Sequence, residues 1–170
     1  MKTLAGAILF AAALAPNLMF AQAPKQPKTA EQTLKGNFDY VHKQILDMAK
    51  DFPEDKYGYK LKPEMRSFGE VIEHVTVGVI YASKAGRGEK ANWGEEEKNA
   101  KPHKTKAEIV AYLEKAFADA DAAMKINPLG PQKNLSPFLD VLEHSAEHYG
   151  LLVAYYRANG IVPPASRPQK

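Results

Sequence analysis

The chain contains no cysteine among its 170 residues and only one tryptophan. The absence of cysteine excludes disulfides, cysteine-ligated zinc sites and thiol nucleophiles. Lysine and arginine outnumber aspartate and glutamate by only 23 to 20. Because no basic stripe with interleaved aromatic residues occurs either, we expect no nucleic-acid partner. Internal repeats and strand-like alternation are also lacking, so stability depends on an ordinary core, for which 45% hydrophobic residues suffice.

The longest apolar run, Leu4 to Ala15, lies near the N-terminus and is followed by Ala21-Gln22-Ala23, a small-x-small cleavage sequence. Because the run is too short to span a bilayer, it predicts a secretory signal peptide over residues 1–23. Cleavage after Ala23 would make Pro24 the first residue, so cleavage after Ala21 is the alternative. We therefore expect an exported protein, periplasmic or extracellular, with no stable membrane anchor after cleavage.

The rest of the chain has the size of one domain, predicted over residues 31–167 after a flexible linker over residues 24–30. Apolar residues recur at helical spacing in four stretches, which cover approximately residues 32–49, 67–85, 105–127 and 136–160. Ser67 and Thr105 each open a capping box. Ser136 is predicted as the N-cap of the last helix, with Pro137 at the first helical position, and Gly160 is expected to end that helix. The predicted fold class is all-α, a four-helix bundle.

A polar, charged segment without periodicity, residues 86–103, separates the second and third predicted helices. A connection of this length in a bundle is typical of a lid or a crossover. It contains Trp93, which we expect to anchor it. Gly78, one turn after His74 in the second helix, lowers helix stability by about 1 kcal/mol relative to alanine. This residue therefore indicates a packing or site requirement.

Two histidines of the last predicted helix, His144 and His148, are four residues apart and so share one face. Two imidazoles in this arrangement can hold one metal ion, and His74 of the second helix is the natural third ligand. Such a three-nitrogen site leaves a coordination position open, as catalytic sites do. The alternative is that His144 and His148 are partly buried polar residues bonded to their neighbours.

Several other residues are weaker candidates for the same site. Four carboxylates near the histidines could orient ring N–H groups or be solvated surface charges; they are Glu70, Glu73, Glu143 and Glu147. His42 is either a fourth ligand, a general base or, as we prefer, a histidine on the flank of the surface. Tyr81 and Tyr149 could donate hydrogen bonds to a substrate, but ordinary core or rim positions are favoured. His103 is expected to have no role.

Two stretches carry a resemblance to a known family: RSFGEVIEHV, residues 66–75, and HYGLLVAYYRANGIVPPASR, residues 148–167. With them, the chain resembles the DinB/YfiT-like superfamily (DinB family) of four-helix-bundle proteins classed as metalloenzymes. The resemblance implies a divalent-metal triad of His74, His144 and His148. It also implies a long crossover between the second and third helices of the bundle. Some relatives use low-molecular-weight thiols, but those thiols are cytosolic, and many relatives have no assigned activity.

These observations lead to two hypotheses of function. In the first, the protein is a metal-dependent hydrolase or transferase acting on an unknown small molecule. In the second, it is a non-catalytic bundle that binds metal, a ligand or a partner. Three imidazoles suit zinc, nickel, copper, iron or manganese, so the sequence leaves the metal open. It is also silent on oligomeric state, although bundle faces commonly pair and a homodimer stays an alternative.

Overall fold

The computed structural model describes residues 28–126 and 135–168, where the regular secondary structure is helical. The helices are α1 (Ala30–Asp51), η1 (Glu54–Lys56), α2 (Phe68–Gly86), α3 (Trp93–Asn99), α4 (Lys106–Ile126), α5 (Ser136–Ala158) and η2 (Pro164–Ser166). The same residues contain no strand, only one antiparallel bridge between Lys60 and Ser67. The prediction of an all-α fold is confirmed. The predicted signal peptide, 1–23, and linker residues 24–27 lie outside the described residues.

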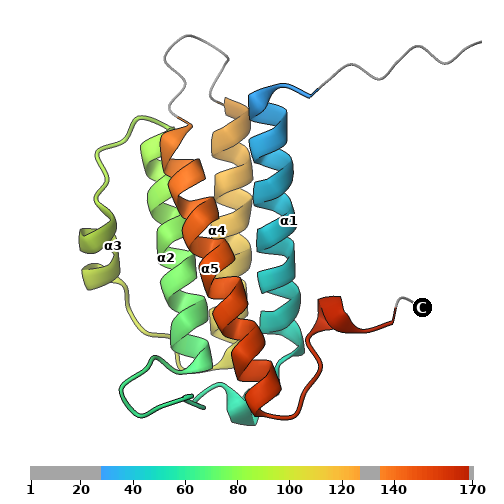
Figure 1. Cartoon of the computed structure of the whole chain (residues 1–170). Coiled ribbons are helices and arrows are strands. Elements are labelled where there is room, and N and C mark those ends of the chain that lie inside the picture. Colours follow the sequence, from blue (N-terminus) through green and yellow to red (C-terminus); the bar gives the residue numbers. More distant parts are fainter. Residues whose placement is uncertain (1–27, 127–134, 169–170) are drawn as a thin grey trace, which may run out of the picture.

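Four long helices, α1, α2, α4 and α5, lie side by side (Figure 1). α1 packs against α4 and α5, and α2 packs against the same two helices, so α1 and α2 occupy opposite corners. The connection from α2 to α4 contains α3 and returns along the outside of α2 to the end where α2 began. As a result α2 and α4 run in the same direction, and α2 lies directly beside α5.

The helix boundaries follow from local capping. Ser67 accepts a hydrogen bond from the backbone of Glu70, whose carboxylate accepts one in return, as predicted for the start of α2. The capping box predicted at Thr105 is also present. α1 begins at Ala30, two residues before the predicted start, because Thr29 and Gln32 form a capping box that the sequence analysis missed.

The start of α5 differs from the prediction in one respect. Its N-cap is Leu135 and not Ser136, which is already the first helical residue, with Pro137 following it in the first turn. Proline is tolerated there because a first-turn residue has no intrahelical acceptor for its missing N–H. At the other end, Gly160 adopts the left-handed conformation, with φ of +69°, and so ends the helix as predicted.

An aromatic cluster at one end of the four long helices sets the position of α5. The rings of Phe52 and Phe68 stack with centroids 3.9 Å apart, and Tyr156 packs against both. The hydroxyl of Tyr155 donates to the carbonyl of Arg66, and that of Tyr156 donates to the carbonyl of Met48 at 2.8 Å. These bonds attach the end of α5 both to the start of α2 and to α1, and thereby set the register of α5 against α2.

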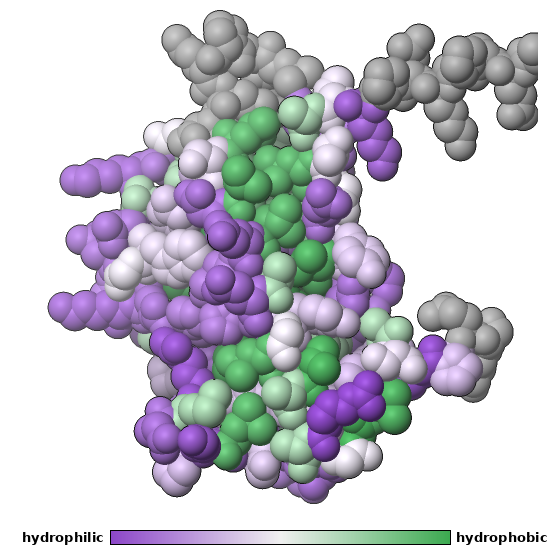
Figure 2. Space-filling view, in the orientation of Figure 1, coloured by the Kyte–Doolittle hydropathy of each residue, from purple (hydrophilic) through white to green (hydrophobic). Residues whose placement is uncertain are grey.

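A second apolar cluster, built around Phe38, Val79, Phe138 and Val141, fills the other end. On the surface, Figure 2 shows polar side chains gathered over α3 and its flanking segments, and apolar side chains gathered along the face that contains α5. None of the helices in residues 28–126 and 135–168 combines the length and the apolar character that a membrane span requires.

Candidate metal centre

Three histidines meet between the two apolar clusters, where α2 and α5 pack side by side. His74 comes from the middle of α2, and His144 and His148 come from consecutive turns of α5. Each offers one ring nitrogen, and these nitrogens lie within 4.8 Å of one another. The ring centroids are 4.8 Å apart for His74 and His144, 4.9 Å for His74 and His148, and 4.3 Å for His144 and His148. The structure thus brings together the three residues grouped from the sequence, called here the His triad.

The triad is partly buried, and two of its ring nitrogens have no partner in the part of the protein that the structure describes. The Nδ1 atoms of His144 and His148 are buried and have no hydrogen-bond partner. The Nε2 atoms of His74 and His144 are 2.9 Å apart and face each other. A buried polar atom without a partner costs about 1–3 kcal/mol, so a cluster with two of them requires an explanation. Three converging imidazoles with orphan nitrogens fit a transition-metal ion, which accepts such lone pairs.

The protonation state of the triad also suits a metal. Burial and the neighbouring imidazoles lower the pKa of His144 to about 4. Burial and His74 lower the pKa of His148 to about 4. Both rings are therefore neutral in neutral solution, and the neutral ring is the form that binds a metal ion.

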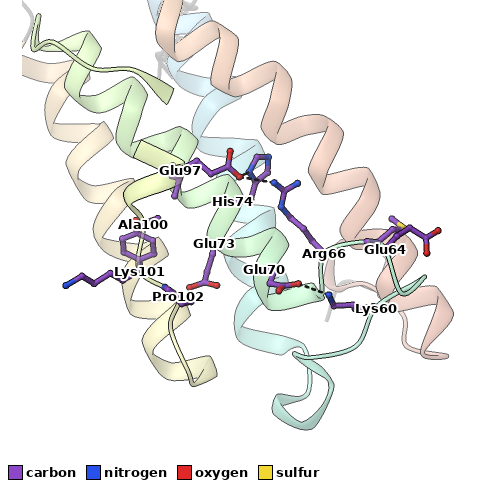
Figure 3. A pocket seen from close by; sticks show the side chains of 13 residues that line it. Lys60, Glu64, Arg66, Glu70, Glu73, His74, Glu97, Ala100, Lys101 and Pro102 are labelled. Carbon is purple, nitrogen blue, oxygen red and sulfur yellow. Dashed lines mark hydrogen bonds and ion pairs between the residues drawn. The ribbon is translucent and has the colours of Figure 1, made fainter. Parts of the chain in front are cut away.

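A carboxylate from the crossover holds the third histidine. Oε1 of Glu97 lies 2.7 Å from Nδ1 of His74 and also accepts a 2.9 Å hydrogen bond from Nη2 of Arg66 (Figure 3). Burial raises the pKa of Glu97, but its bonds to His74 and Arg66 outweigh burial, so the pKa lies below its ordinary value. Glu97 is thus ionised and accepts from the Nδ1–H of His74.

The carboxylates considered from the sequence have other partners or are exposed. Glu70 caps α2, and Glu73 accepts hydrogen bonds from the backbone N–H and the Nδ1 of His103, at 2.7 and 2.8 Å. Glu143 and Glu147 are exposed. Among the described residues, Glu97 is the carboxylate bonded to the triad. Glu97 was not among the predicted site residues because α3 is too short to show periodicity. The signal that could have found α3 is Asn92, whose side chain caps the helix at Glu95.

Trp93, at the other end of the same face of α3, covers His144. Its ring meets that of His144 edge-on, with centroids 4.7 Å apart, and stacks on Tyr81 with centroids 5.4 Å apart. A Cβ atom at Gly78 would lie 2.6 Å from Cζ2 of the indole. Gly78 therefore provides the space for Trp93, which is the packing requirement that the sequence indicated.

His42 is not a surface residue, and this prediction is wrong. Its side chain is buried, with only 3% of the residue exposed. Nδ1 donates to the carbonyl of Phe38 at 2.8 Å, so Nε2 accepts the hydrogen bond from Oγ of Ser145 at 3.0 Å. Burial lowers the pKa of His42 to about 4. Because both ring nitrogens are engaged, His42 is a satisfied core residue and does not belong to the triad.

The remaining candidates also have structural partners. His103 was expected to have no role, but its bonds to Glu73 attach the start of α4 to α2. Tyr81 stacks on Trp93, and Tyr149 borders a groove beside α1 that also involves Tyr40. Both tyrosines are therefore packing or rim residues, as the sequence favoured.

A pocket of about 340 Å³ opens beside the triad, between α2, the segment before it and the end of α3 (Figure 3). Its lining includes His74, Arg66, Glu97, Pro102 and Tyr112. Of the triad, His74 is the member that borders the pocket. A small molecule in the pocket would therefore approach the site from the side of His74.

No family model matches the chain, and a search of curated proteins finds no match.

Proposed function

We propose that this chain is an exported four-helix-bundle protein of the DinB-like type that binds one divalent transition-metal ion through the His triad. The observation that carries the proposal is the convergence of three imidazoles from two helices, with buried and unpartnered nitrogens on two of them. The order of the helices supports the family assignment, since α1 and α2 lie at opposite corners and a long crossover leads to α4.

The activity that we infer is that of a metal-dependent hydrolase or transferase. A bound divalent ion lowers the pKa of water or another group in its open position and so supplies a nucleophile near neutral pH. The pocket beside His74 gives a small molecule access to the site. Arg66 and Tyr112 line that pocket, and their side chains carry hydrogen-bond donors suited to orienting the small molecule there. The donor set suits zinc, nickel, iron, copper or manganese.

The decisive experiment is the metal content of the purified mature protein, measured by elemental mass spectrometry. We expect about one equivalent of a transition metal in the wild type and its loss in His144→Ala. His103→Ala is the matched control, because it removes a partly buried histidine that is bonded to Glu73 and lies outside the triad. A wild type that holds no metal, even after reconstitution, would sink the proposal.

A second candidate is a non-catalytic metal-binding bundle, and the position of Trp93 favours it. The indole covers His144, and only His74 of the triad borders the pocket. The two candidates differ in whether a coordination position exchanges with solvent. In a cobalt-substituted chain, azide changes the visible spectrum if such a position is open. An unchanged spectrum would favour the non-catalytic candidate.

Export is a separate part of the proposal and has its own test. N-terminal sequencing of the protein recovered outside the cytoplasm should begin at Gln22 or Pro24, according to whether cleavage follows Ala21 or Ala23. An N-terminus at Met1 in the mature protein would contradict the signal peptide and leave the metal site unaffected.

A further inference from the structure

α3 presents one face to the triad. Trp93 and Glu97 are four residues apart and therefore share a side of this seven-residue helix. Through them α3 contacts two of the three histidines, His144 by the indole and His74 by the carboxylate. The helix is also attached to α2 by an ion pair between Lys84 and Glu96, at 2.7 Å. The crossover therefore touches the site directly.

The geometry at Glu97 differs from that of an ordinary surface ion pair. One carboxylate oxygen, Oε1, accepts hydrogen bonds from both the Nδ1 of His74 and the Nη2 of Arg66. The side chain of His74 is only 12% exposed and that of Glu97 is 37% exposed, so the bond is shielded from solvent on the side of the histidine. Hydrogen bonds to an ionised acceptor are also stronger than neutral ones. The pair therefore fixes the orientation of the His74 ring.

The bond also determines which nitrogen of His74 is available. A carboxylate accepts, so the proton of the neutral ring is on Nδ1, and Nε2 presents a lone pair toward His144. In metal sites a carboxylate behind a histidine sets the tautomer and raises the basicity of the ligand. In the described part of the chain, the Nδ1 atoms of His144 and His148 have no such partner. His74 is thus the one member of the triad that the protein orients by a carboxylate.

We propose that Glu97 is the positioning residue of the metal centre, which holds the proton of His74 on Nδ1 and so presents Nε2 to the ion. Arg66 and the packing of α3 hold Glu97 in place. This inference rests on the proposed function, because it assigns Glu97 a role toward a metal bound by the triad. It explains why a short helix interrupts the crossover at this point.

The first test is the affinity of the purified chain for Zn²⁺, measured by competition with a chromophoric chelator. Loss of such a carboxylate lowers metal affinity by about 10- to 100-fold, and we expect this loss in Glu97→Ala. Glu97→Gln should recover part of it, because the amide oxygen can accept the same two bonds. Glu96→Ala is the matched control, since it removes an ion pair from the same helix without touching His74.

The second test uses the metal-free protein and needs no bound ion. Long-range ¹H–¹⁵N correlation spectra of the histidine rings report which nitrogen carries the proton. We expect Nδ1-protonated His74 in the wild type and in Glu96→Ala, and a shift toward the Nε2-protonated tautomer in Glu97→Ala. This measurement separates positioning from general destabilisation, which would not change one tautomer selectively.

The outcomes separate the two proposals. If the wild type binds Zn²⁺ and Glu97→Ala binds it equally well, or if the His74 tautomer is unchanged in that variant, the positioning role of Glu97 is overturned and the metal site stands. If the wild type binds no metal, the proposed function fails, and the role of Glu97 toward a metal fails with it.

Discussion

The contact between Gly78 and Trp93 allows a prediction about protein stability, for which a second helical glycine, Gly36, is the control. A Cβ atom at Gly78 would lie 2.6 Å from the indole, closer than real contacts allow, whereas a Cβ atom at Gly36 would meet no heavy atom within 4 Å apart from the nearby backbone of α1 itself. Both glycines lie in helices, where alanine is favoured because it loses less backbone entropy on folding. Both substitutions therefore reduce the backbone entropy lost on folding, and only Gly78→Ala adds a steric clash with Trp93.

The entropic gain and the steric cost together decide which of the two variants is more stable. Gly36→Ala should raise the free energy of unfolding by about 0.5–1 kcal/mol. Gly78→Ala has the same gain, offset by an overpacking cost of about 1–3 kcal/mol. We therefore expect Gly78→Ala to be less stable than Gly36→Ala by about 1–3 kcal/mol. The difference is smaller if α3 moves away to relieve the contact.

Urea denaturation followed by circular dichroism measures the stability of both variants, and fluorescence reports on α3. Trp93 is the only tryptophan, so the emission spectrum comes from this one contact. Displacement of the indole into water shifts its emission to longer wavelength. Equal stabilisation by the two substitutions, together with an unchanged emission spectrum in Gly78→Ala, would refute the packing described here.

Two further predictions concern the buried His42. Its pKa in the folded chain is about 4 against an ordinary 6.5, so the unfolded chain binds the proton first as the pH falls. His42 by itself should lower the free energy of unfolding by about 1.4 kcal/mol per pH unit between pH 6.5 and 4, roughly 3 kcal/mol in all. The stability of His42→Gln should lack this part of the pH dependence. Identical pH profiles of wild type and variant would show that His42 is not a buried, neutral histidine. Ser145→Ala removes the only hydrogen bond of Nε2 and should cost about 1–3 kcal/mol. Ser83→Ala, which loses only a bond to its own helix, should cost less; equal losses would show that the bond to His42 contributes nothing specific.

Much of the helical architecture was predictable because its signals are local. The capping boxes at Ser67 and Thr105 and the left-handed Gly160 depend on residues within one turn, and the structure contains all three. The box at Thr29 was equally local but was missed beside the lysine- and proline-containing linker. The start of α5 was displaced by one residue, because Ser136 is already helical and Leu135, which makes no side-chain capping bond, is the N-cap.

Short elements and burial were harder to predict. α3 has seven residues, too few for a periodic pattern, so the segment resembled a loop. For the same reason Glu97 could not be paired with His74, which is 23 residues away. His42 resembled a flank residue because helical spacing does not show how closely a neighbouring helix packs. Its burial depends on Phe117 and Ser145, which come from two other helices.

The sequence by itself determined four long helices, the face shared by His144 and His148, and the candidacy of His74, because helical periodicity alone places residues four apart on one side. Only the tertiary structure decided that α2 lies beside α5, which brings His74 within reach of the other two histidines. It also decided that Glu97 is the carboxylate behind His74 and that Trp93 covers His144. The reason is that these contacts join distant segments, and their geometry is set by how whole helices pack against one another.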